Sequence, residues 1–143
     1  MSAAPGEIRI GAELVSAPYL LDEAAAKAYH EGIERPPRRR PRGNIHDDRD
    51  AARKAGFAAP IAGGEQTIAI IAQFLADNFG MRFVRGGRIE VALTRPVLYG
   101  DTLTSHAKIV SIDASRAALQ IHVDNQRDEQ VLTGTAAVRM GDA

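Results

Sequence analysis

The sequence has 143 residues, of which 45% are hydrophobic and 25% charged, and its 18 basic residues balance 18 acidic ones. This profile is typical of one soluble globular domain, which we expect to span residues 1–143 and to fold without disulfides or a structural metal. A formal net charge of zero argues against a general nucleic-acid-binding protein, and the absence of cysteine excludes a disulfide framework and Cys-ligated zinc or iron–sulfur sites.

The first part of the chain predicts an extended segment, a helix and a loop. The extended segment covers Glu7–Leu14, and the helix is capped by Asp22 and ends near Gly32. Residues 35–43 contain three prolines and five arginines, which forbid a regular helix and favour an exposed loop. This loop is either simply solvated, or Arg38, Arg39 and Arg40 form a clamp for an anionic ligand, because guanidinium groups match phosphate oxygens.

Two further helices follow. Asp47 or Asp48 is expected to cap a short helix over Arg49–Ala55, with Gly56 at its end. After Gly63-Gly64, residues 65–77 carry apolar or small side chains on nearly every face. Such a segment predicts a central helix that other elements wrap.

The second half of the chain is typical of β-structure. Residues 88–93 and 119–124 alternate between apolar and polar side chains, and residues 102–112 and 131–140 are rich in β-branched residues. We therefore predict long antiparallel strands. A buried helix followed by an antiparallel meander implies an α+β domain in which a curved sheet packs on the helix.

The sequence also bears on location. No apolar stretch approaches the roughly 20 residues that cross a bilayer. The first residues, MSAAPGEIRIG, lack the charged region and apolar core of a signal peptide. We expect a cytoplasmic protein with no membrane partner.

His46 is the first candidate for chemistry, because imidazole moves protons near neutral pH and Asp47 and Asp48 stand beside it. The alternative is that one carboxylate only caps a helix while His46 packs or faces solvent. The other histidines, His30, His106 and His122, are less promising. His106 and His122 lie in predicted strands, and the three are not spaced as a helical metal motif, so we expect no metal site.

Gly63-Gly64 is the second candidate, because it opens the predicted central helix. Backbone N–H groups in a first helical turn have no intrahelical partners and lie at the positive end of the helix dipole. They can hold an oxyanion, and a glycine lets a carbonyl approach the backbone closely. The alternative is a glycine pair that serves only the turn.

These residues belong to a longer pattern that covers most of the chain. Its segments are Asn44-Ile45-His46-Asp47-Asp48, Ala51-Ala52, Gly56-Phe57, Pro60-Ile61-Ala62-Gly63-Gly64 and Arg95-Pro96-Val97-Leu98-Tyr99-Gly100-Asp101-Thr102-Leu103. The pattern resembles the MaoC-like family, which includes the (R)-specific enoyl-CoA hydratases. The last segment is its most specific part. The resemblance implies the hot-dog fold, a long helix wrapped by an antiparallel sheet, in agreement with the α+β architecture inferred above.

The resemblance also implies an activity. A homodimer or higher homo-oligomer, or a pair with another hot-dog subunit, would bind an acyl-CoA and add water to a trans-2-enoyl double bond, or remove it. Coenzyme A would be part of the substrate, with no separate cofactor. His46 falls on the family's catalytic His and Gly64 on the glycine whose N–H holds the thioester oxygen. Gly63, Asn44 and the arginines 38–40 would contact the substrate.

The sequence departs from the family pattern at one catalytic position, because Pro41 stands where the family has its Asp. Three hypotheses follow. In the first, Asp47, Asp48 or Glu65 supplies the missing carboxylate, with Asp48 the weakest candidate because it also matches a non-catalytic family Asp. In the second, the domain is a catalytically silent acyl-CoA-binding subunit. In the third, it is an acyl-CoA thioesterase in which Glu65 activates water.

Overall fold

The computed structural model describes residues 7–32 and 43–141, which form a sheet, a long helix and three shorter helices. The strands are β1 (Glu13–Val15), β2 (Tyr19–Leu21), β3 (Arg88–Leu93), β4 (Asp101–Ile112), β5 (Arg116–Asp124) and β6 (Gln130–Arg139). The helices are α1 (Glu23–Gly32), α2 (Arg49–Lys54), α3 (Gly64–Phe79) and α4 (Met81–Val84). No helix of the described part of the chain is long and apolar enough to cross a membrane.

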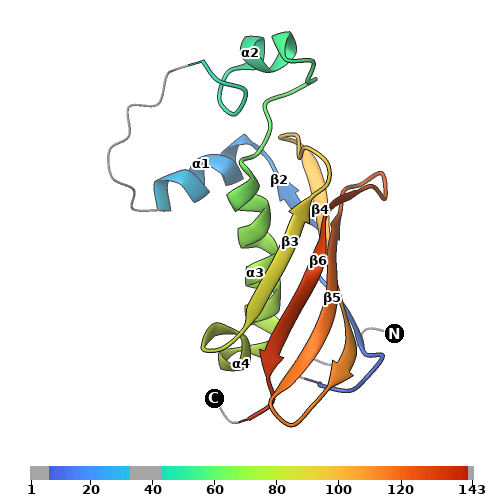
Figure 1. Cartoon of the computed structure of the whole chain (residues 1–143). Helices are drawn as coiled ribbons and strands as arrows, with labels where there is room; N and C mark the ends of the chain where they lie inside the picture. The colour runs from blue at the N-terminus through green and yellow to red at the C-terminus, as the bar shows by residue number, and fades with distance from the viewer. Residues whose placement is uncertain (1–6, 33–42, 142–143) are drawn as a thin grey trace.

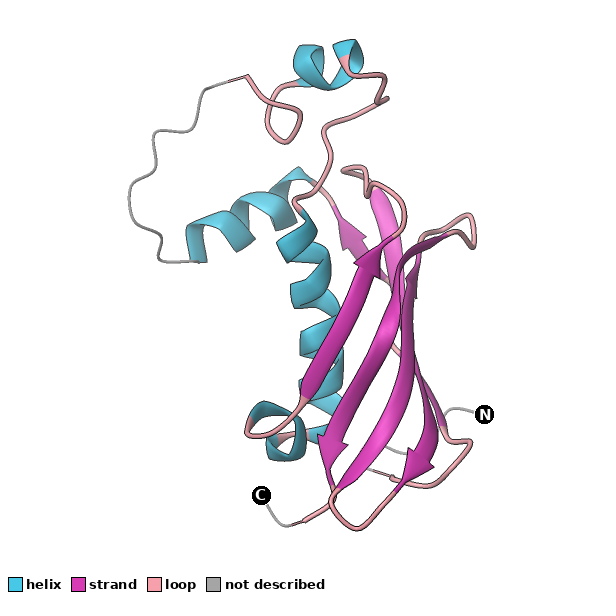
Figure 2. Ribbon diagram, viewed as in Figure 1, coloured by secondary structure: helices cyan, strands magenta, loops and turns pink. Residues whose placement is uncertain are grey.

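The sheet is antiparallel throughout, with strand order β1-β4-β5-β6-β3, and β2 also pairs with β4. The long helix α3 runs along one face of this sheet, while α1 and α2 lie near one of its ends (Figure 1). Figure 2 shows the same two layers, helix and curved sheet. This is the hot-dog fold, so the α+β prediction is confirmed.

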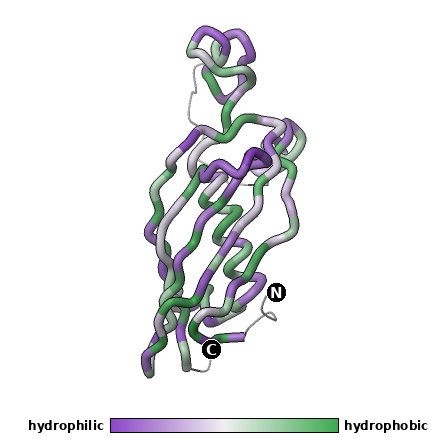
Figure 3. Tube along the Cα trace, turned by 90° about the vertical axis from the view of Figure 1, so that its right-hand side faces the viewer, coloured by the Kyte–Doolittle hydropathy of each residue, from purple (hydrophilic) through white to green (hydrophobic). Residues whose placement is uncertain are grey.

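The core lies between α3 and the inner face of the sheet. Side chains in β5 alternate between buried and less buried positions, and those of β4 do so over most of its length, so each strand has one apolar face. The tube in Figure 3 shows this alternation between hydrophobic and hydrophilic residues along the strands. Helix α3 contributes Ile71, Phe74, Leu75 and Phe79 to the core. The sheet covers one side of α3, while Glu65, Gln73 and Asp77 on the helix are exposed, and the helix start, Gly64, is half-buried at the edge of the core.

Most predicted elements agree with the structure, but the extended segment expected over Glu7–Leu14 forms a strand only at β1, because Ile10 and Gly11 lie in a turn in which Gly11 has a positive φ. Asp22 caps α1 as expected, since its Oδ1 accepts the Ala25 N–H at 2.8 Å. Of the two candidates for the α2 cap, it is Asp48 that accepts the N–H groups of Asp50 and Ala51. Strand β2 and helix α4 were not predicted, because segments of three and four residues are too short to show a periodic pattern.

The turn before β4 is held by a buried carboxylate. Asp101 is only 3% exposed, its Oδ2 accepts the Leu98 N–H at 2.9 Å, and its Oδ1 accepts from the Gln126 side chain at 2.9 Å. In this turn the Tyr99 N–H donates to Pro60 O at 2.9 Å, and Leu98 forms a bridge with Ile61. Asp101 therefore stabilises the segment 97–99, to which residues 60–62 are hydrogen-bonded.

Replacing Asp101 by Ala should lower the free energy of unfolding by about 1–2 kcal/mol, because it removes the buried acceptor of the partly buried Leu98 N–H and of the Gln126 side chain. Urea denaturation followed by circular dichroism measures the change. Asp50→Ala, which removes an exposed carboxylate, is the control and should stay within about 0.5 kcal/mol of the parent. Equal losses for the two variants would show that the Asp101 bonds do not stabilise the turn.

Candidate active site

His46 lies in a turn that is tied to the segment leading into α3. The Asn44 side chain accepts the His46 N–H at 2.8 Å, and the Ile61 N–H donates to Ile45 O at 3.0 Å. The ring Nδ1 of His46 lies 2.8 Å from Ile61 O. Because a carbonyl oxygen only accepts, Nδ1 carries the hydrogen of the neutral ring. The lone pair is then on Nε2, which makes that atom the candidate proton acceptor.

The start of α3 lies next to this histidine. Gly63 is the N-cap and supplies no side-chain hydrogen bond, and Gly64 is the first helical residue. The Ala62 N–H donates to Val97 O at 2.8 Å, which anchors the approach to the helix. The Gln66 N–H donates to Gly63 O at 3.0 Å, and no side chain of the N-cap residue caps this 16-residue helix. The start of α3 is a positive helix terminus suited to a negatively charged oxygen.

His46 and Gly64 line the same small cavity of about 330 Å³. The end of β3 and the segment that follows it complete its wall, with residues 93–97 on that side. A Cβ built on Gly64 would lie 2.3 Å from Leu93 Cδ1, so the glycine allows Leu93 to pack against the helix start. A candidate base and a helix N-terminus thus face one space.

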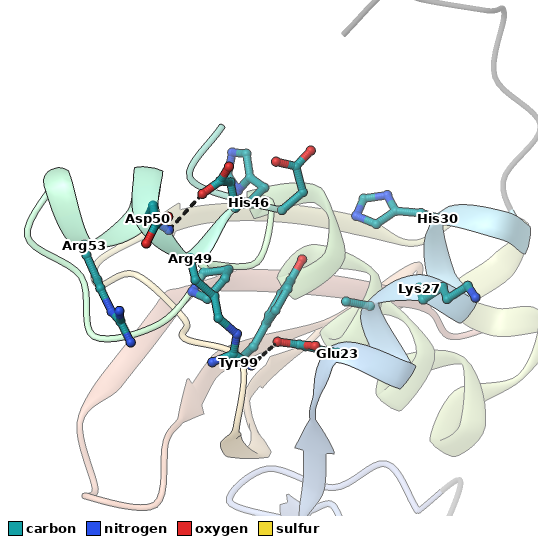
Figure 4. A pocket seen from close by; sticks show the side chains of 12 residues that line it. Glu23, Lys27, His30, His46, Arg49, Asp50, Arg53 and Tyr99 are labelled. Carbon is teal, nitrogen blue, oxygen red and sulfur yellow. Dashed lines mark hydrogen bonds and ion pairs between the residues drawn. The ribbon is translucent and has the colours of Figure 1, made fainter. Parts of the chain in front are cut away.

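His46 also lines a larger cleft of about 820 Å³ between α1, α2 and the turn at Tyr99 (Figure 4). Its walls carry the cations Lys27, Arg49 and Arg53, and the carboxylates Glu23, Asp47, Asp48 and Asp50. Arg49 on α2 pairs with Glu23 on α1 across the cleft, as Figure 4 shows. His46 therefore lies on the wall of both cavities.

Tyr99 was not predicted as a functional residue, although it lies in the most specific segment of the sequence pattern. Its side chain points into the cleft (Figure 4). Burial raises the pKa of the Tyr99 hydroxyl, and the nearby carboxylates of Asp47 and Glu23 raise it further. The hydroxyl therefore stays protonated at neutral pH and is available as a hydrogen-bond donor.

The three candidate carboxylates have different surroundings. Asp48 lines the cleft, but its Oδ1 is held by the two N–H groups at the start of α2. Asp47 is exposed, lines the cleft, and accepts the Asn44 N–H at 3.0 Å. Glu65 is exposed in the first turn of α3, and it lines neither the cleft nor the smaller cavity.

The remaining predicted site residues fall into two groups. Asn44 and Gly63 shape the backbone, Asn44 by holding the His46 N–H and Gly63 as the N-cap of α3. Arg38, Arg39, Arg40 and Pro41 lie outside the described residues. The structure thus brings together His46, Asp47, Asp48 and Tyr99 around one cleft, and His46 and Gly64 around one pocket.

Comparison with solved structures gives matches over nearly the whole chain. The R-hydratase PhaJ1 from Pseudomonas aeruginosa, in its unliganded form, has a TM-score of 0.76 at 20% identity, covering 98% of this chain and 86% of that one. The (R)-hydratase from A. caviae involved in PHA biosynthesis gives 0.73 at 18% identity, covering 94% and 98%. The MaoC-like dehydratase from Rhodospirillum rubrum gives 0.68 at 26% identity, covering 95% and 96%.

The fold and site together define a hot-dog domain in which a histidine shares a cavity with the N-terminus of the central helix. The family model described as "MaoC like domain" matches residues 43–131, which contain His46, Gly64 and the Asp101 turn. The chain belongs to the MaoC-like dehydratase family. A search of curated proteins found no match.

Replacing Gly64 by Ala should lower the free energy of unfolding by up to about 1 kcal/mol, since the half-exposed Leu93 side chain must turn away from the new Cβ. Adding Leu93→Ala to the same chain should restore most of this loss, because it removes the methyl group that the new Cβ would meet. A denaturation cycle over the four chains measures the coupling. Equal losses in both backgrounds would show that Gly64 and Leu93 do not pack as described.

Proposed function

We propose that the protein is a hydratase or dehydratase that interconverts a trans-2-enoyl-CoA and a 3-hydroxyacyl-CoA. The observation that carries the proposal is the shared pocket of His46 and Gly64, in which a base with a fixed tautomer faces a helix N-terminus. Membership of the MaoC-like family supports the reaction class. Coenzyme A enters as part of the substrate, and the reaction as proposed needs no separate cofactor.

In the proposed hydration step, His46 Nε2 takes a proton from water while the water oxygen forms a bond to C3 of the enoyl group. The electron pair of the C2=C3 bond moves toward the thioester, and negative charge develops on its oxygen. Backbone N–H groups at Gly64 and the first turn of α3 stabilise that charge. Return of a proton to C2 completes the 3-hydroxyacyl product, so water is consumed and nothing leaves.

A second proton-transfer group would bind the water or return the proton to C2. Asp47 is our first candidate, because it lines the same cleft as His46 and its carboxylate acts on the Tyr99 hydroxyl. Glu65 is the second, because it follows Gly64 directly. Asp48 is the third, because capping α2 already occupies its Oδ1.

The cleft is the proposed binding site for the coenzyme A part of the substrate. Coenzyme A carries a pyrophosphate and a ribose phosphate, which guanidinium and ammonium groups recognise. Lys27, Arg49 and Arg53 line the cleft, although Arg49 is already paired with Glu23. The arginines 38–40 precede the His46 turn in the sequence and are proposed to add positive charge to this cleft, whose walls carry four carboxylates beside the three cations.

A partner along strand β3 is also part of the proposal. β3 is one edge of the sheet, and Leu93 at its end is half exposed. An open strand edge of this kind invites pairing with another strand. We propose a homodimer, with a second hot-dog chain as the alternative, since similar folds occur in the ChsH1-ChsH2 and HadBC complexes from Mycobacterium tuberculosis.

The leading alternative is a catalytically silent subunit that binds acyl-CoA, and Pro41 at the family's Asp position favours it. A thioesterase, with Glu65 activating water, is the other. One experiment separates the three: incubation with crotonyl-CoA and a longer trans-2-enoyl-CoA, followed by enoyl absorbance and free thiol in parallel. Loss of absorbance without thiol supports the hydratase. Thiol release indicates the thioesterase, and binding without either signal indicates the silent subunit.

His46→Ala should reduce the hydration rate at least about a hundredfold, the usual scale for a positioned proton-transfer group. The measurement is kcat/KM with crotonyl-CoA. His122→Asn, which alters a histidine on β5 outside both cavities, is the matched control and should keep the parent rate. A His46→Ala rate equal to that of the parent would place the base elsewhere.

Substitutions of the three candidate carboxylates should differ in their effect on kcat in the same assay. Asp47→Asn should lower kcat at least about tenfold if Asp47 takes part in proton transfer. Asp48→Asn should change kcat little, because Asn is also a good N-cap and preserves α2. A loss confined to Glu65→Gln would instead assign the second carboxylate to the start of α3.

Replacing Arg38, Arg39 and Arg40 together by Ala should weaken acyl-CoA binding more at low salt than at high salt, because salt screens exposed charges. Titration calorimetry at two ionic strengths measures the difference. Arg116→Ala, an exposed arginine on β5, serves as the control for a general loss of positive charge. Unchanged affinity at low salt in the triple variant would refute the arginine clamp.

A further inference from the structure

Two histidines that the sequence places 16 positions apart meet on the outer face of the sheet. The register of β4 and β5 puts His106 directly opposite His122, and their rings stack with centroids 4.3 Å apart and planes 7° from parallel. Their sequence neighbours Ala107 and Ile121 point into the core. Since side chains alternate along a strand, the two imidazoles lie on the face opposite α3.

Asp124 completes a cluster of three potential metal ligands. It lies two residues after His122 on the same face of β5. One of its oxygens, Oδ2, is 3.3 Å from His106 Nε2 and 3.4 Å from His122 Nε2. The three ligand atoms all lie within 4.8 Å of one another, and the three side chains are partly buried.

These separations match what a metal ion requires. Zinc binds imidazole nitrogen and carboxylate oxygen at about 2.0–2.2 Å, which puts two ligand atoms of a tetrahedral site roughly 3.3 Å apart. The two nitrogen–oxygen distances, 3.3 and 3.4 Å, are close to this value. Binding of both imidazoles to one ion requires the two stacked rings to turn about their side-chain bonds until their lone pairs converge.

We propose that His106, His122 and Asp124 bind one divalent transition-metal ion, Zn²⁺ above all, on the outer face of the sheet. Two imidazole nitrogens and one carboxylate oxygen suit Zn²⁺, Ni²⁺ or Cu²⁺, whereas Mg²⁺ and Ca²⁺ require mainly oxygen ligands. The three protein ligands leave a fourth position for water. The site is separate from the proposed active site, since none of its residues lines either cavity there.

The backbone holds this arrangement before any metal arrives. His106 and His122 lie within the sheet, because β4 is paired with β1 and β5 at His106, and β5 is paired with β4 and β6 at His122. Asp124 lies where the register of β5 and β6 shifts, and irregularities of this kind re-aim a side chain relative to the strand. Little ordering is therefore needed on binding, and ligands held on rigid strands favour affinity.

The test uses the full chain without a histidine tag, stripped of metal by a chelator, and titrates it with ZnCl₂ in a calorimeter. The expected result is one Zn²⁺ per chain, no binding heat with MgCl₂, and a Zn²⁺-dependent rise in melting temperature. His106→Asn and His122→Asn should each weaken Zn²⁺ binding about tenfold or more, since replacing a residue that only hydrogen-bonds to a metal ligand already costs about that much affinity. His30→Gln, outside the cluster, is the control and should bind as the parent does.

A second measurement does not depend on whether the variants fold. Co²⁺ added to the unaltered chain should give visible absorption of a low-coordinate site, and Zn²⁺ should displace it. Absence of Zn²⁺ binding in the parent would overturn the proposal and leave the three groups as two stacked imidazoles beside a carboxylate. So would Zn²⁺ affinity that survives both histidine substitutions, or a stoichiometry of one ion for two chains, which contradicts a site within one chain.

Discussion

The contacts of Ile61 are the constraint on which the candidate active site depends. The Ile61 carbonyl oxygen accepts a hydrogen bond from the His46 ring, and the Ile61 N–H donates to Ile45 O. Ile61 also forms a β-bridge with Leu98. Three residues later the chain becomes α3. The backbone of Ile61 therefore sets both the tautomer of the histidine and its distance from the helix N-terminus. A shift of this strip would move the base relative to the N–H groups at the start of α3, because the Ile61 carbonyl holds the imidazole ring.

The segment Arg95–Leu103, which carries the most specific family resemblance, has a structural task more than a chemical one. The buried carboxylate of Asp101 closes the turn, and the turn supports Ile61 and Ala62 through Leu98 and Val97. Its one direct contribution to the cleft is Tyr99, whose hydroxyl stays protonated in the field of two carboxylates. A recognisable motif can thus position a site without supplying its reacting groups.

The sheet separates two kinds of chemistry by face. Its inner face is apolar and packs on α3, so that reactive groups gather where the helix begins and the core ends. Its outer face needs no apolar residues, and there β4 and β5 carry His106, His122 and Asp124. The departure at Pro41 bears only on the first of these sites. There Asp47 shares a cleft with His46, while Asp48 is held as a helix cap.

The sequence by itself determined the fold class, the central helix, the main strands and the identity of His46 and Gly64 as a pair of candidates. These follow from local signals, namely hydrophobic period, capping residues and a short motif, which involve neighbours in the chain. It also indicated a cap at Asp47 or Asp48, but only the backbone geometry chose Asp48. Strand register decided what no local pattern contains: residues 106 and 122 become neighbours because β4 and β5 pair at that offset. The tautomer of His46 was likewise decided by a carbonyl 15 residues away, since tertiary contacts alone bring such groups together.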